Sequence, residues 1–184
     1  ILVVEDEFIA RLALVELLRH AGYTVLEAES AQTAIPLLDG ADMVLTDQFM
    51  HDGDGWAMLA AVRQQHPHMP VILLSADQPR PPPNWPADIA FDAVLSKPCD
   101  EQVVLEQIQR RMDLYAESAI ARLPPEDRAT LHKMVAQGEA TDLEAWSLAL
   151  GQGQPGQALL SRLLHHAALT LDFARLQTWV HKPG

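Results

Sequence analysis

Five polar side chains directly follow or close short apolar stretches of this chain. Glu5 and Asp6 follow "ILVV", Asp47 follows "MVLT", Ser75 closes "VILLS" and Lys97 follows "AVLS". Their types are three carboxylic acids, a hydroxyl and an amine. Clustered carboxylates repel one another, and burial makes their charge more unfavourable. A divalent cation such as Mg2+ relieves that repulsion because it binds oxygen ligands.

These residue types are the ones needed to accept a phosphoryl group. Lys97 can pair with a carboxylate or with an incoming phosphoryl oxygen, and Ser75 can donate a hydrogen bond to another oxygen. A single acid at the end of a strand is more often a cap or turn residue, and Asp6 could simply cap the next helix. All five types in this order favour a phosphoryl-accepting site at Asp47.

The elements that must position these residues alternate along the chain. Continuous apolar stretches and β-rich segments predict five strands, at 1–4, 23–28, 42–46, 70–76 and 90–96. Helical spacing predicts helices at 8–18, 30–38, 55–65 and 100–123. This alternation favours a parallel sheet with right-handed crossovers, in which the carboxyl ends of the strands form one polar edge.

One segment interrupts the alternation. The stretch "DQPRPPPNWPAD", residues 77–88, contains five prolines between the fourth and fifth predicted strands. Proline in the interior of a helix is unfavourable by about 3 kcal/mol or more. We therefore expect an extended or irregular connection in place of a regular fourth helix.

Composition restricts the class of protein. The net charge is −12, with 17 acidic and 7 basic residues in 1–112 and 8 acidic and 6 basic residues in 113–184. Neither part has the basic character of a nucleic-acid-binding protein. A single cysteine, Cys99, excludes an internal disulfide. No apolar run reaches the roughly 18 residues of a membrane span. We also expect no signal peptide. We expect a cytoplasmic protein whose chain, which opens on Ile1, is trimmed at its start.

Four motifs together resemble the receiver domain of two-component response regulators. They are "VVEDE", "LTDQFMHDGDG", "LLSA" and "LSKP", and the resemblance covers residues 1 to about 115. It implies a flavodoxin-like, doubly wound sheet of five parallel strands. It also implies that Glu5 and Asp6 bind Mg2+ and that Asp47 accepts phosphate from a histidine kinase or phosphotransfer protein. The backbone carbonyl of Phe49 would complete the metal site.

The same resemblance assigns roles to two further residues and exposes two departures. Ser75 would be the switch hydroxyl and Lys97 the lysine of the family, with a cis bond to Pro98. Four residues after the phosphoacceptor the family usually has proline, whereas this chain has His51. The aromatic switch position, three residues before the lysine, is Val94. An inward-turning aromatic side chain is therefore not predicted here.

The chain after the receiver-like part is predicted to be helical throughout. We expect a small all-α domain at 116–184, following a receiver domain at 1–115. "LPPEDRATLHKMVAQG" is faintly similar to the opening of a LuxR-type helix-turn-helix domain. The segment that would read DNA, "QALLSRLLHHAAL", has one arginine and no lysine, which disfavours phosphate contacts. The pattern is more similar to the helical tail that follows receivers in some hybrid sensor kinases.

Two functional hypotheses follow from these patterns. The first is a bacterial phosphorelay module with Mg2+ as cofactor, either free-standing or the C-terminal part of a hybrid histidine kinase. Its helical tail would not bind DNA, and it could dimerise through the helix at 100–123 and the tail. The alternative is a DNA-binding transcriptional regulator with a degenerate helix-turn-helix. No second catalytic constellation is present, so kinase activity would require a kinase core upstream.

Overall fold

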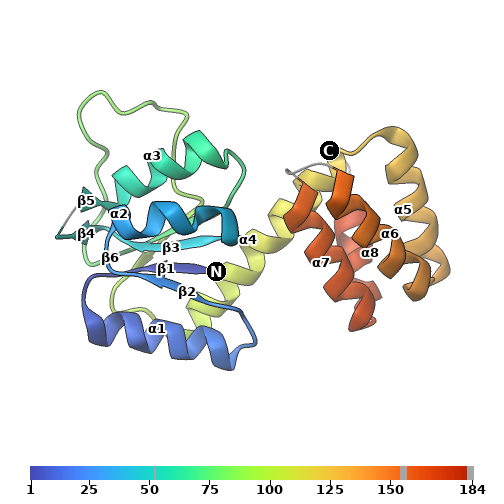
Figure 1. Cartoon of the computed structure of the whole chain (residues 1–184), viewed down its shortest axis with the longest axis horizontal. Coiled ribbons are helices and arrows are strands. Elements are labelled where there is room, and N and C mark those ends of the chain that lie inside the picture. Colours follow the sequence, from blue (N-terminus) through green and yellow to red (C-terminus); the bar gives the residue numbers. More distant parts are fainter. Residues whose placement is uncertain (52, 154–156, 182–184) are drawn as a thin grey trace. The chain divides into compact units, whose positions relative to one another are not determined.

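Parallel strands form the centre of the first part of the chain. The computed structural model describes residues 1–51, 53–153 and 157–181 (Figure 1). Its main sheet has the strand order β2-β1-β3-β6-β7, and every pairing in it is parallel. The strands are β1 (Leu2–Val4), β2 (Leu26–Ala28), β3 (Val44–Asp47), β6 (Val71–Ser75) and β7 (Ala93–Ser96). The doubly wound, flavodoxin-like sheet of five parallel strands is confirmed.

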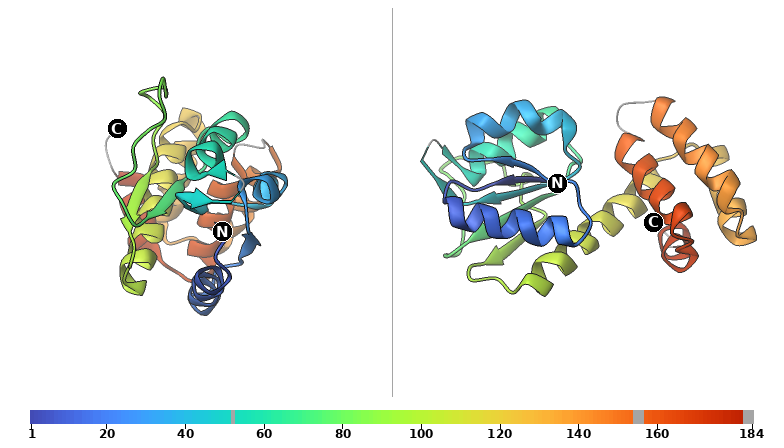
Figure 2. Two further views of the ribbon diagram at one scale, coloured as in Figure 1. Left: turned by 90° about the vertical axis from the view of Figure 1, so that its left-hand side faces the viewer. Right: turned by 60° about the horizontal axis from the view of Figure 1, so that its bottom comes forward.

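Helices cover both faces of this sheet. Helices α2 (Ala31–Ala34) and α3 (Gly55–Gln65) lie on one face, and α1 (Phe8–His20) lies on the other (Figures 1 and 2). The core on the first face contains side chains from β1, β3 and β6 and from both covering helices. They include Leu2, Val4, Ala31, Ala34, Val44, Met58, Leu59, Val62 and Val71. Burial of both faces explains why the three central strands, β1, β3 and β6, are apolar along nearly their whole length rather than alternating.

Two local features differ from the sequence-based expectation. The helix predicted through residue 38 is α-helical only from Ala31 to Ala34 and continues as a 3-10 helix, Ile35–Gly40. Pro36 has no N–H to donate to an α-helical hydrogen bond, which accounts for the change. The loop after Asp47 also contains a small antiparallel hairpin of β4 (Phe49–Met50) and β5 (Gly53–Asp54).

The proline-rich connection between β6 and β7 contains no helix in residues 77–92, all of which the structure describes. The irregular connection expected here is confirmed. It is held in place by aromatic contacts, because Trp85 and Phe91 both contact Trp56 of α3. The ring centroids lie 5.1 Å and 4.8 Å from that of Trp56, in edge-to-face geometry. The indole N–H of Trp85 donates to the carbonyl of Ile89 at 2.7 Å.

The chain divides into two compact units, Ile1–Arg111 and Met112–Gly184. Helix α4 (Glu101–Ala121) passes from one unit into the other, and α5 (Pro125–Gln137), α6 (Ala140–Gly153), α7 (Ala158–Leu169) and α8 (Phe173–His181) follow. The helical region expected after the receiver-like part is confirmed. Within the described residues, no helix has both the length and the apolar character needed to cross a membrane.

The second unit has its own apolar core. The distal part of α4 contributes Ala116, Ala119 and Ile120, which pack with residues of all four later helices. Those residues include Leu131, Leu143, Leu160, Leu164, Leu176 and Trp179. The carboxylate of Asp113 accepts hydrogen bonds from Arg175 Nε at 2.8 Å and from Trp179 Nε1 at 2.9 Å. These contacts show that the tail helices pack as one body with the end of α4.

Candidate functional site

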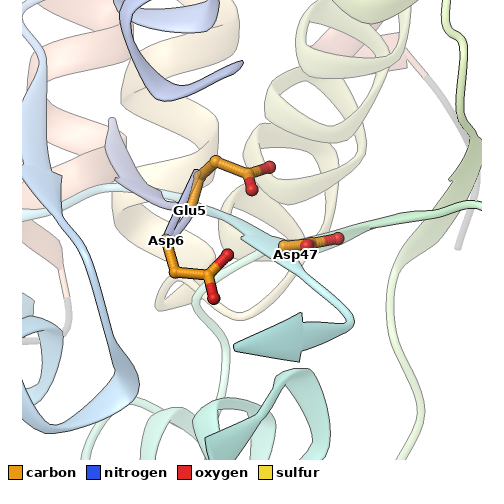
Figure 3. A group of neighbouring side chains, drawn as sticks. All are labelled: Glu5, Asp6 and Asp47. Atoms are coloured by element: carbon orange, nitrogen blue, oxygen red, sulfur yellow. The ribbon is translucent and has the colours of Figure 1, made fainter. Parts of the chain in front are cut away.

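Three carboxylates meet at the carboxyl edge of the sheet. Val4 of β1 pairs with Thr46 of β3, so the residues that follow them, Glu5 and Asp47, are neighbours. Glu5, Asp6 and Asp47 each place one carboxylate oxygen within 4.8 Å of the other two. Figure 3 shows Glu5 and Asp6 leaving the end of β1 beside Asp47 of β3. The reversal of strand order between β1 and β3 is where α/β sheets of this type bind ligands.

Lys97 reaches this cluster from the end of β7. Its Nζ lies 2.6 Å from Oε2 of Glu5 and 3.0 Å from Oδ1 of Asp47. Its backbone N–H donates to the carbonyl of Ser75 at 2.7 Å, and its peptide bond to Pro98 is cis, as the resemblance implied. One lysine is thus shared between two of the three acids.

Burial and charge shift the proton affinities of this pair. Burial raises the pKa of Glu5, and the charge of Asp47 adds to that effect, while Lys97 opposes it. Burial alone would lower the pKa of Lys97, but hydrogen bonds and attraction from Glu5 and Asp47 outweigh it and raise that pKa. Three carboxyl groups share a single lysine at this partly buried site, so the acidic groups outnumber the basic one.

This donor set fits a hard divalent cation. All three side chains offer carboxylate oxygens, which Mg2+ prefers, and the site lacks enough positive charge of its own. Phe49, whose backbone carbonyl is the fourth predicted ligand, lies in β4 two residues after Asp47. Its ligand role stays a prediction.

Asp6 contacts His51, the residue that stands where the receiver family usually has proline. Its Oδ2 accepts a hydrogen bond from the backbone N–H of His51 at 3.1 Å and also contacts the imidazole Nδ1 of that residue. The helix that follows is capped by Glu7, whose carboxylate accepts from the N–H groups of Ile9 and Ala10. Asp6 is therefore not the helix cap, and its carboxylate points to the acidic cluster.

Ser75 is close to the cluster in the sheet but is hydrogen-bonded elsewhere. Its side chain is buried, and its hydroxyl donates to Oε1 of Gln48 and to the carbonyl oxygen of Asp77. Among the described residues, no hydrogen bond joins the Ser75 hydroxyl to Asp47. Gln48 was not among the predicted site residues. The only sign of Gln48 in the sequence was its place, as a polar residue directly after the strand-end acid Asp47.

A glycine allows α3 to begin close beneath Asp47. The N–H of Gly55 donates to the carbonyl of Gln48 at 2.9 Å. A Cβ at position 55 would lie 2.8 Å from the carbonyl oxygen of Asp47 and 2.6 Å from Cδ1 of Leu73. Such distances are sterically excluded, so only glycine fits here without displacing the backbone of Asp47.

The fold and the clustered acids agree with the comparison to known families. Residues 1–109 match the family model of the response regulator receiver domain. This match covers more than half of the chain, so the chain belongs to the receiver domain family of two-component signalling.

Individual relatives are consistent with this assignment. The chain is 30% identical over 126 residues to the response regulator protein FleR of Pseudomonas aeruginosa, covering 67% of this chain and 25% of FleR. It is 32% identical over 115 residues to the chemotaxis protein CheY of the same organism, covering 60% of this chain and 93% of CheY. A solved receiver domain from the hybrid histidine kinase CckA superposes with a TM-score of 0.50 at 27% identity, covering 60% of this chain and 95% of that one. The chain thus spans about a quarter of FleR and nearly the whole of CheY.

Proposed function

We propose that this protein accepts a phosphoryl group on Asp47 and relays a two-component signal through its helical C-terminal region. The observation that carries the proposal is the acidic cluster at the end of the sheet. One oxygen of each of Glu5, Asp6 and Asp47 lies within 4.8 Å of the others, and Lys97 Nζ lies 3.0 Å from Asp47 Oδ1.

The hydrogen bonds of Asp47 support its role as the acceptor. Oδ1 is engaged by Lys97 Nζ and by the N–H of Gln48, at 3.0 Å and 2.8 Å. Oδ2 is then the oxygen left to form a bond to phosphorus, as the bond from phosphorus to the donor histidine breaks. Lys97 and the hydroxyl of Ser75 would neutralise and orient the phosphoryl oxygens.

We assign the metal site to the same residues. Glu5, Asp6, Asp47 and the carbonyl of Phe49 would hold Mg2+. A bound Mg2+ supplies charge neutralisation for the carboxylates and for the phosphoryl oxygens.

The donor would be a cognate histidine kinase or a phosphotransfer protein in the cytoplasm. Receiver domains occur both alone and within larger proteins, and the similarity to a receiver of the hybrid histidine kinase CckA supports a hybrid origin. A free-standing protein is the other arrangement of the same function. In either case this chain would contribute the acceptor site, and not kinase activity.

The helical region would act through protein contacts rather than through DNA. Helix α7 spans the segment in which a recognition helix would be expected, and it contains a single arginine, Arg162, and no lysine. Phosphate contacts from basic side chains dominate DNA affinity, so this composition opposes the alternative of a transcriptional regulator. Binding of the full chain to duplex DNA that weakens steeply with salt would favour that alternative instead.

Phosphorylation with a small-molecule donor tests the acceptor. Incubation with acetyl phosphate and Mg2+ should label the wild-type chain, and peptide mapping should place the acyl phosphate on Asp47. Asp47→Asn should remove the label. Asp54→Asn is the matched control, because Asp54 is the next acid in the described chain and Asn retains its helix-capping function. Full labelling of Asp47→Asn would exclude Asp47 as the acceptor.

A further inference from the structure

The side chain of Gln48 is buried beside the proposed phosphoacceptor. Only 6% of the residue is exposed, although glutamine is mostly found on protein surfaces. Its backbone N–H lies 2.8 Å from Asp47 Oδ1 and 3.0 Å from the carbonyl of Leu74, and its own carbonyl accepts from Gly55 at 2.9 Å. Because Asp47 pairs with Leu74 in the sheet, Gln48 lies level with Ser75.

The amide of Gln48 faces the hydroxyl of Ser75. That hydroxyl is buried, donates to Gln48 Oε1 and lies 2.6 Å from the carbonyl oxygen of Asp77. Its oxygen also accepts from the N–H of Asp77 at 3.1 Å. A hydroxyl has one proton, which these two acceptors share, so none remains for a group bonded to Asp47.

We propose that Gln48 is a positioning residue that holds the Ser75 hydroxyl away from Asp47. The inference rests on the proposed function, in which Ser75 turns to donate to a phosphoryl oxygen. That turn removes the hydroxyl from Gln48 and leaves a buried amide oxygen without its partner, which is unfavourable. Gln48 therefore shifts the equilibrium of Ser75 toward the unphosphorylated arrangement.

In this role, Gln48 weakens the binding of a phosphoryl group, or of a tetrahedral mimic of one, at Asp47. Gln48→Met keeps the length of an unbranched side chain and removes the hydrogen bond. The full-length variant should bind beryllofluoride, with Mg2+ present, about threefold to tenfold more tightly than wild type, the ratio expected from one neutral hydrogen bond. Titration calorimetry or NMR measures this affinity, and thermal unfolding confirms that each variant is folded.

Two further variants separate positioning from a structural effect. Thr46→Val is the matched control: it removes another buried hydroxyl, one that bonds to the carbonyl of Asp47 at 3.1 Å, and should leave the affinity unchanged. Gln48→Met in a Ser75→Ala background should give no gain over Ser75→Ala alone, because no hydroxyl remains to be held. If Gln48→Met does not fold, Gln48→Leu carries the same comparison.

The outcomes distinguish this inference from the proposed function. Equal or weaker binding by Gln48→Met, or the same gain when Ser75 is alanine, would overturn the role of Gln48 alone. Beryllofluoride binding that survives unchanged in Asp47→Asn would overturn the proposed function and this inference with it. Tighter binding that depends on both Ser75 and Asp47 would establish the role of Gln48.

Discussion

At the scale of single residues, the site is defined by an imbalance of charge. Glu5, Asp6 and Asp47 bring three carboxylates together, and Lys97 contacts two of them. Asp6 is the third acid, which Lys97 does not contact, and its Oδ2 accepts a hydrogen bond from the backbone N–H of His51 instead. Removing Asp6 should therefore affect metal binding while leaving the ion pairs of Lys97 in place.

We predict that Asp6→Ala abolishes stabilisation of the protein by Mg2+. A ligand that binds only the folded state, present at a concentration of about ten times its Kd, adds about 1.4 kcal/mol to the free energy of unfolding. Wild type should show this gain in chemical denaturation at saturating Mg2+, relative to EDTA. His51→Ala is the control, because it removes the imidazole and keeps the carboxylate of Asp6. An equal Mg2+ gain in Asp6→Ala would exclude Asp6 as a ligand.

At the scale of elements, the proline-rich connection is the unusual part of this receiver. Where a helix would usually separate β6 from β7, residues 77–92 follow an irregular path. Prolines prevent a helix, so backbone hydrogen bonds cannot hold this segment in a regular form. Trp85 supplies an alternative by packing against Trp56 and donating to Ile89. Phe91 also packs against Trp56, so aromatic contacts rather than secondary structure anchor the segment.

Trp85→Ala should loosen this connection without disturbing the sheet. Loss of an edge-to-face aromatic contact and of partly buried area should lower local stability by on the order of 1–3 kcal/mol. Hydrogen exchange across 77–92 should accelerate, while exchange in β3 and β6 stays as in wild type. Gln78→Ala, at an exposed position of the same segment, should leave exchange unchanged. Unaltered protection in Trp85→Ala would show that other contacts fix the connection.

At the scale of the whole molecule, two units have separate apolar cores. One lies between the sheet and the helices α2 and α3, and the other lies among α5–α8 and the end of α4. In the second unit, α5 has proline at its start and glycine at its end. Pro125 begins α5, and Gly138 ends it with a φ of 69°. This positive φ favours glycine, which explains the sharp stop of that helix.

We predict that the two cores can be weakened independently. Leu164 is fully buried in the second unit, so Leu164→Ala should destabilise that unit by about 2–5 kcal/mol. Labelling of Asp47 by acetyl phosphate should stay within about twofold of wild type, because Asp47 belongs to the unit with the other core and shares no packing partner with Leu164. Leu59 belongs to the core between the sheet and α3, so Leu59→Ala should reduce both the labelling of Asp47 and the free energy of unfolding of the first unit. Loss of labelling in Leu164→Ala would show that the receiver unit depends on the helical region.

The sequence predicted the sheet and most of the site. Apolar stretches identified the strands, and parallel strands must bring their carboxyl ends to one edge, so the strand pattern predicted that Glu5, Asp47 and Lys97 lie at that edge. The prolines of 77–88 likewise excluded a fourth helix. Local chain chemistry decides these features, because they depend on backbone geometry and on which residues must be buried. The end of the α-helix before Pro36 was missed, although Pro36 is visible in the sequence, because 3-10 turns commonly continue a helix at its end and the apolar spacing does not distinguish them.

Only the tertiary structure decided which side chains meet within the site. Gln48 and Ser75 are 27 residues apart, and Asp6 and His51 are 45 apart. No local spacing encodes such pairs. Their contacts depend on the register of neighbouring strands, on the rotamers that close packing permits and on the loop that returns His51 to β1. The sequence by itself therefore determined the chemical groups at this edge of the sheet, and folding determined which partner each group holds, because hydrogen bonds form only where packing brings donor and acceptor together.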